Sequence, residues 1–211
     1  MATFGEIQTD IADMLLDPSN TAVSASIVAT AINNSIAYWK FRRFWFNTAV
    51  YDSTMIAQDP KIYLPTGFLV ELPMNDGFVI SYSNSLYPII KRNPRDYDEI
   101  YSANGYGMPR IYRLKAGEYN VYPLPDQAYT CKVWYLKDYA NLVNSGDTND
   151  FTNNASQLIT YWAASKLFAE RRQDDKMEAY YSARAQDEYK NLQIRNEKAN
   201  SSGHITIHSI L

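Results

Sequence analysis

The residues that could carry acid–base or metal chemistry are few. Both histidines of the chain, His204 and His208, lie near its end. Their spacing of four would place them on one face of a helix, but Gly203 and the neighbouring isoleucines favour a strand. In a strand the two imidazoles lie about 13 Å apart, too far to bind one metal ion. With no histidine elsewhere, a serine or cysteine nucleophile lacks an imidazole base.

Carboxylates in expected loops are the other candidates, because a pair of them could hydrolyse a glycoside. They are Asp59, Asp96, Asp98 and Glu99. Acidic loop residues are more often solvated charges, so a hydrolase that uses Asp96 or Asp98 is the least favoured of three functional hypotheses.

Two further loops imitate known binding motifs without completing them. Residues 104–107 read Asn-Gly-Tyr-Gly but lack the Lys-Ser/Thr pair of a phosphate-binding loop. Residues 147–150 are acidic but lack the glycine and glutamate offsets of a calcium loop, and a helix N-cap explains them better. We therefore expect no catalytic residue, no cofactor and no metal, and the chain is not predicted to be an enzyme.

Composition excludes further classes of function. The net charge of −3 provides no basic surface for tight nucleic-acid binding. Cys131 is the single cysteine, which argues against a disulfide framework and fits assembly in a reducing cytoplasm. We expect a soluble protein with no membrane contact, since no apolar run approaches about 18 residues and no signal segment is evident.

Tyrosine is the unusual component, with 18 residues against 8 phenylalanines. Its ring and hydroxyl suit protein interfaces and sugar-binding faces, although tyrosine also favours half-buried strands. Both interpretations stay open from composition alone.

Helices are predicted at the N-terminal end. Thr3 and Glu6 have the spacing of a capping box, and apolar residues follow at helical intervals until Asp17-Pro18. A second helix is expected from a cap at Asn20 or Thr21 to about residue 46. Its apolar seam consists of Val28, Ile32, Ile36 and Trp39, with Arg42 and Arg43 near its C-terminus.

Between residues 48 and 141, short runs alternate apolar and polar residues with period two. This pattern predicts the short strands of a sandwich or barrel. Residues 78–82 and 87–90 flank a hairpin turn at 83–85, and 93–106 predict a long loop or a short helix with a loop. Runs at 111–112, 119–122 and 129–135 predict an antiparallel meander that organises the rest.

The C-terminal part again predicts helices. One covers 151–172, and another begins after Asp174 and Asp175 and runs from 176 to about 199. The seam expected for the last helix is Met177, Tyr180, Tyr181, Ala185 and Leu192. In residues 204–211 apolar β-branched and polar residues alternate again, which is typical of a strand. Three alternatives stay open: the segment pairs with the chain's own sheet, adds a strand to another chain, or is a frayed terminus.

The predicted fold class is α+β. A helical bundle of two N-terminal and two C-terminal helices, residues 1–47 and 148–199, carries an inserted antiparallel β domain at 48–147 and an extended C-terminal arm at 200–211.

Several short motifs, taken in order, resemble the adaptor (tail gatekeeper) proteins of tailed bacteriophages. They are an Arg-Phe-Trp-Phe run that closes the N-terminal helices, Tyr-Leu-Pro-x-Gly-Phe at 63–68, Pro-Arg-x-Tyr at 109–112, Val-Tyr-Pro-Leu-Pro-Asp at 121–126, Val-Trp-Tyr at 133–135, and a helical pair after Asn-Asp-Phe. The resemblance covers most of the chain and is closest to short-tailed phages; a neck protein of a long-tailed phage is the neighbouring alternative.

This resemblance implies a virion neck protein, assembled in the host cytoplasm, that forms a homo-oligomeric ring of about 12 copies. It implies a portal protein above, a tail or nozzle protein below, and non-specific passage of double-stranded DNA. The expected docking residues toward portal or neighbour are Ile205, Ile207, Ile210 and Leu211. Those expected at a subunit or tail interface are Trp39, Tyr112, Trp134, Tyr180 and Tyr181. The alternative is a carbohydrate-binding β module, motivated by the tyrosine and tryptophan content.

Overall fold

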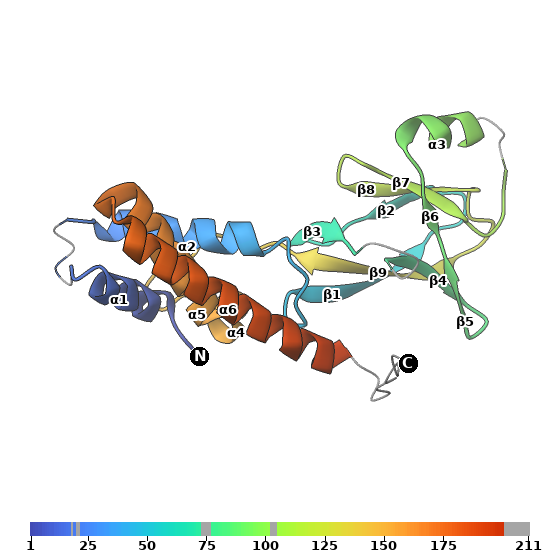
Figure 1. The fold of residues 1–211 in the computed structure, drawn as a ribbon. Coiled ribbons are helices and arrows are strands. Elements are labelled where there is room, and N and C mark those ends of the chain that lie inside the picture. The colour runs from blue at the N-terminus through green and yellow to red at the C-terminus, as the bar shows by residue number, and fades with distance from the viewer. Residues whose placement is uncertain (18, 20–21, 73–76, 102–104, 201–211) are drawn as a thin grey trace, which may run out of the picture. The chain divides into compact units, whose positions relative to one another are not determined.

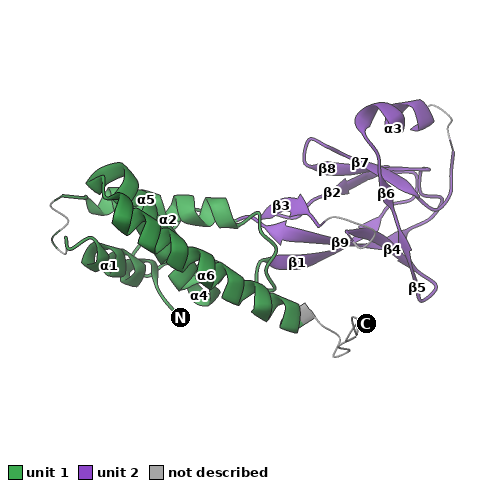
Figure 2. Cartoon of the chain, in the orientation of Figure 1, with its two compact units in different colours: residues 1–47, 139–211 green, residues 48–138 purple. Residues whose placement is uncertain are grey.

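The computed structural model describes residues 1–17, 19, 22–72, 77–101 and 105–200. It divides the chain into two compact units, which Figure 2 colours separately. Residues 1–47 and 139–211 form unit 1, the helical unit; residues 48–138 form unit 2, the β unit. Both units are labelled by element in Figure 1.

The return to the helical unit comes earlier in the chain than the predicted residue 148. Residues 139–147 belong to the helical unit, because their backbone bonds to it. The Asn33 side chain accepts from Leu142 N (2.8 Å) and donates to Leu142 O (3.0 Å). The backbone N–H of Phe4 donates to Asp147 O at 2.9 Å. The polar composition of this segment suggested a linker, but hydrogen bonds hold it against the two N-terminal helices.

The first helix, α1 (Phe4–Met14), begins as predicted. Glu6 N donates to Thr3 Oγ1 at 3.3 Å, and Thr3 N donates to Glu6 Oε2 at 2.8 Å, which completes the capping box. These bonds hold the pKa of the Glu6 carboxyl below its usual value. Phe4, Ile7 and Ile11 are buried along one face.

The second helix, α2 (Ala25–Trp39), is shorter than predicted at both ends. Its N-cap is Ser24, while Asn20 and Thr21 lie outside the described residues. It ends at Trp39, because the buried Asn47 side chain holds residues 40–47 in a turn: its amide donates to Arg42 O (2.7 Å) and its oxygen accepts from Phe44 N (2.8 Å). Arg42 and Arg43 therefore follow the helix. The predicted seam is confirmed, since Val28, Ile32, Ile36 and Trp39 are all buried.

The helix predicted over 151–172 is interrupted. The structure has α4 (Asp150–Asn154), α5 (Ser156–Leu167) and a π-helical turn, η1 (Phe168–Arg172). Ala155, at φ −137° and ψ 28°, separates α4 from α5, and Gln173 in the left-handed region ends η1. Apolar spacing continues across both breaks, which is why periodicity alone missed them.

The last helix, α6 (Asp175–Asn200), has the predicted start. Asp174 Oδ1 accepts from the backbone N–H groups of Lys176 and Met177, each at 3.1 Å. Its buried seam differs at one position: Ala185 and Leu192 are buried and Tyr181 is half-buried, but Tyr180 is 52% exposed. Together with α1, α2 and α5, this seam encloses the core of the helical unit.

The β unit contains two sheets. One has the order β1-β9-β4-β5, with β3 also paired to β9; the other has the order β2-β8-β7-β6. The strands are β1 (Thr48–Met55), β2 (Lys61–Tyr63), β3 (Phe68–Glu71), β4 (Phe78–Tyr82), β5 (Ser85–Pro88), β6 (Ile90–Lys91), β7 (Ile111–Lys115), β8 (Glu118–Tyr122) and β9 (Tyr129–Lys137).

The predicted meander is wrong in its last step. β7 and β8 pair antiparallel as expected, but β9 leaves for the other sheet, where it pairs with β1, β3 and β4. Residues 123–128 carry two prolines, which cannot donate to a sheet, so the chain does not turn back onto β8 there. β9 is the central strand of its sheet, and β6 pairs parallel to β7.

The predicted hairpin is confirmed between β4 and β5. Tyr82 pairs with Ser85, and the two turn residues Ser83 and Asn84 both have positive φ, at 49° and 59°. Two positive φ values define a turn whose twist matches that of the strands. The segment after β6 contains a short helix, α3 (Pro94–Tyr101), which is the second of the two alternatives expected there.

The α+β class is thus observed, with one core in each unit. In the β unit, buried side chains of both sheets, among them Phe78, Tyr119 and Val133, share a core in the manner of a sandwich. The bundle arrangement of the helices stays a prediction.

Candidate interaction surfaces

Among the described residues, no group of three histidines, cysteines or carboxylates is placed to hold a metal ion. The loop carboxylates have structural partners: Asp59 accepts from Lys61 N at 2.9 Å, and Asp96 accepts from the Asn93 amide at 2.8 Å. Asp98 pairs with Arg113, and Glu99 with Arg95. These contacts do not converge on a cleft. His204 and His208 lie outside the described residues.

The acidic cluster at 147–150 caps backbone, as its N-cap interpretation predicted. Asp147 Oδ2 accepts from the N–H groups of Val143 and Asn144, both at 2.8 Å, which lowers the pKa of the carboxyl. Asn149 is the N-cap of α4 and forms a capping box with Thr152. Cys131 is fully buried, and burial raises the pKa of its thiol to about 12, which leaves it inert as a nucleophile.

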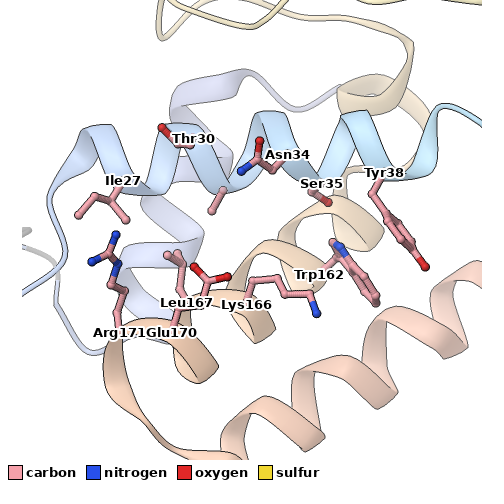
Figure 3. Close-up of a pocket in the computed structure, with 11 residues that line it drawn as sticks. Ile27, Thr30, Asn34, Ser35, Tyr38, Trp162, Lys166, Leu167, Glu170 and Arg171 are labelled. Atoms are coloured by element: carbon pink, nitrogen blue, oxygen red, sulfur yellow. The ribbon is translucent and has the colours of Figure 1, made fainter.

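A groove runs between α2 and α5 in the helical unit, with a volume of about 550 Å³. Figure 3 shows α2 side chains along one wall and α5 and η1 side chains along the other. The floor holds the small or apolar residues Ala31, Ser35 and Leu167, and Lys166, Glu170 and Arg171 supply charges at the rim. Such a surface, with small or apolar residues inside and charges around them, has the composition of a protein contact.

Aromatic side chains close one end of the groove. Tyr38 is 50% exposed and stacks on Trp162, with ring centroids 4.7 Å apart and planes 20° apart. The Lys166 ammonium lies over the Trp162 ring at 4.7 Å. The stack holds exposed Tyr38 and partly buried Trp162 in place, so these rings lose little further rotamer freedom on binding a partner.

A second aromatic surface lies where α5 meets α6. Tyr181 stacks on Phe168 and Tyr161, at 5.3 and 6.1 Å between ring centroids. Arg184 lies over the rings of Tyr161 and Tyr180, at 5.4 and 5.8 Å, and its bond to the Tyr161 hydroxyl raises the pKa of the guanidinium. We call Tyr161, Tyr180, Tyr181 and Arg184 the tyrosine–arginine surface.

The interface residues expected from the sequence fall into three groups. Tyr180 is exposed and Tyr181 half-buried, both on the tyrosine–arginine surface, and Trp134 is half-buried on β9. Trp39 and Tyr112 are buried in the cores of their own units, at 2% and 5% exposure, because each lies on the core face of its element. Their side chains are not available to a partner. Ile205, Ile207, Ile210 and Leu211 lie outside the described residues.

Sequence reasoning missed one polar cluster in the β unit. Glu71 on β3 accepts hydrogen bonds from the hydroxyls of Tyr112 (2.9 Å) and Tyr119 (2.6 Å), and pairs with Lys91. Burial, with Glu71 beside them, raises the pKa of both tyrosines. The cluster ties β3 of one sheet to β7 and β8 of the other. Its only signal in the sequence was the tyrosine count.

Comparison with protein families gives a match that covers nearly the whole chain. The model of the family described as SU10 adaptor protein matches residues 2–206, which is nearly the whole chain and spans both units. No curated protein matches the chain significantly. Among the described residues, no helix has the length and apolarity that crossing a bilayer requires.

Proposed function

We propose a ring-forming role for this chain, which belongs to the SU10 adaptor protein family of bacteriophage structural adaptors. The family is one of virion components rather than enzymes. In our proposal, about 12 copies form a ring in the virion neck, joined to a portal protein above and to a tail or nozzle protein below. The observation that carries the proposal is the family match across nearly the whole chain.

The helical unit supports this role because it has two distinct exposed surfaces. A closed ring of identical subunits needs a head-to-tail interface, in which one surface of each copy meets a different surface of the next. Trp162 and Lys166 of α5 line the groove, whereas Tyr161 belongs to the tyrosine–arginine surface. Successive helix residues project about 100° apart, so these surfaces lie on different sides of α5.

Charge supports the passage of DNA through the ring. At −3 per chain, 12 copies carry roughly −36, which repels the DNA backbone and limits sticking. Residues 203–211 are proposed to dock on the portal or on a neighbouring subunit. Deleting them should abolish docking of the ring onto the portal or the contact between copies; a truncated chain that still forms rings and docks would refute that part of the proposal.

The direct test is native mass spectrometry or electron microscopy of the full chain, with and without the portal protein of the same phage. We expect a closed ring, at least in the portal's presence. A chain that stays monomeric in both samples contradicts the proposal. A glycan array distinguishes an adaptor from the alternative, a carbohydrate-binding β module, because an adaptor should bind none of the sugars.

A further inference from the structure

Within the part of the β unit that the structure describes, one long strand edge lacks the usual protection against pairing. Edges are commonly protected by shortness, proline, bulges or charge. Among the described residues, β2 and β6 have three and two residues, β5 ends in Pro88, and the pairing of β3 shifts between Phe68 and Val70. β1 has eight residues, all paired in register with β9 and with no shift, and β9 is its one neighbour in the sheet order.

The side chains of β1 also leave its outer edge approachable. Val50 (48% exposed), Asp52 and Thr54 alternate along the exposed face. Asp52, which is the only charged residue of β1, is paired with Lys132 at 3.4 Å. On the opposite face, Tyr51 and Met55 pack on the β-unit core. An added strand with apolar residues on that face would extend the core at its margin.

A segment of the same chain has the matching pattern. Residues 204–211 contain no proline, glycine, lysine, arginine or carboxylate side chain, and Ile205 and Ile207 alternate with Thr206 and His208. Fully extended, these eight residues cover about 26 Å, the length of an eight-residue strand such as β1. A segment that adds to a sheet edge gains main-chain hydrogen bonds, and its alternate side chains set the register.

We propose that the outer edge of β1 binds residues 204–211 of a second copy as an added strand. Ile205 and Ile207 then lie on the core side with Tyr51, and Thr206 and His208 lie beside Asp52 and Thr54. The inference rests on the proposed function, in which copies adjoin in one ring, and it assigns the receptor for a segment whose docking partner was left open. The added strand would link each β unit to another subunit, independently of contacts between helical units.

The test uses disulfide formation between differently tagged full-length copies, mixed with the portal protein. One copy carries Thr206→Cys; the other carries Val50→Cys, Asp52→Cys or Thr54→Cys, which sample the register. Native Cys131 does not compete, because it is buried and its thiol has a raised pKa. The matched control is Leu86→Cys on β5, an edge position of similar exposure (59%).

We expect a mixed dimer on a non-reducing gel from at least one β1 position and none from Leu86→Cys. Adding Val50→Lys to the Thr54→Cys copy should abolish the link, since an edge lysine blocks strand addition while leaving the exposed site folded, as circular dichroism would verify. Links no stronger than those of the Leu86 control, or rings without any β1 link, would each overturn the inference and leave the ring intact. A chain that never assembles overturns both proposals.

Discussion

Tyrosine serves different purposes in the two units. In the β unit three buried tyrosines have hydroxyls bound inside the structure: Tyr112 and Tyr119 donate to Glu71, and Tyr97 donates to Val121 O at 2.9 Å. The same unit also has exposed tyrosines at its surface. In the helical unit the rings of Tyr38 and Tyr180 are about half exposed, stacked or capped by cations. Among the described residues, the tyrosines with buried side chains all lie in the β unit and stabilise its interior, whereas those of the helical unit are at least partly exposed.

The contrast explains why a count of 18 tyrosines supported two hypotheses at once. A buried hydroxyl must find an acceptor, which makes a tyrosine structural; an exposed ring held by stacking is prepared for a partner. Burial separates the two roles, and burial depends on tertiary pairing. Substitutions and titrations can test this division between buried, structural tyrosines and exposed ones.

The largest effect is expected from two adjacent residues of α2. Trp39→Ala removes a buried side chain and should lower the free energy of unfolding by about 3–5 kcal/mol. Tyr38→Ala should cost less than about 1 kcal/mol, because its ring is half exposed. Urea unfolding of both variants measures the difference. Equal losses would show that Tyr38 belongs to the core and would break the division.

The next effect concerns the interior of the β unit. Glu71→Ala removes the shared acceptor of two buried tyrosines, and we expect a loss of about 3 kcal/mol. Glu99→Ala is the control, since its side chain is 66% exposed and its pair with Arg95 contributes less than about 1 kcal/mol. Chemical denaturation monitored by near-ultraviolet circular dichroism measures both. A loss for Glu71→Ala no larger than the control's would mean that the tyrosine cluster does not hold the sheets.

Glu71 also marks the limit of prediction from sequence. The capping box at Thr3, the seam from Val28 to Trp39 and the hairpin at Ser83 were predictable because each depends on residues close in the chain. The three residues that meet at Glu71 lie 20 to 48 positions from it, and the strand partners of β9 lie further away still, as the pair Thr48–Leu136 shows. No local pattern encodes such pairing. Trp39 and Tyr112 were expected at an interface, but both are buried in the core of their own unit. An aromatic ring suits a core as well as an interface, so the sequence could not separate the two.

A titration at alkaline pH should report the buried tyrosines of the β unit. Burial raises the pKa of Tyr97, Tyr112 and Tyr119 in the β unit above the unfolded value of about 10. Their stabilisation is therefore complete below about pH 10 and is lost as pH rises through the folded pKa. We expect the tyrosinate absorbance of these three residues to appear only as the β unit unfolds. Unfolding of the β unit at alkaline pH with no rise in tyrosinate absorbance would contradict their buried role.

The smallest effect is expected at acid pH in the helical unit. The pKa of Asp147 is lowered by the N–H groups that it caps, so its contribution is present above about pH 4, the unfolded value, and is lost as pH falls through the folded pKa. Asp147→Asn should remove that part of the acid dependence of the melting temperature. Asp187→Asn, on the exposed face of α6, should retain it. Identical acid profiles for the two variants would exclude the capping role.

The two ends of the β unit are neighbours, because β1 and β9 pair along their whole length and Thr48 lies opposite Leu136. The chain therefore enters and leaves this unit at almost the same point, and a short turn would suffice to join residue 47 to residue 139. An insertion with adjoining ends can be lost, enlarged or exchanged with little disturbance of the host helices. The β unit can therefore be exchanged as a whole while the helices around its entry point keep their contacts.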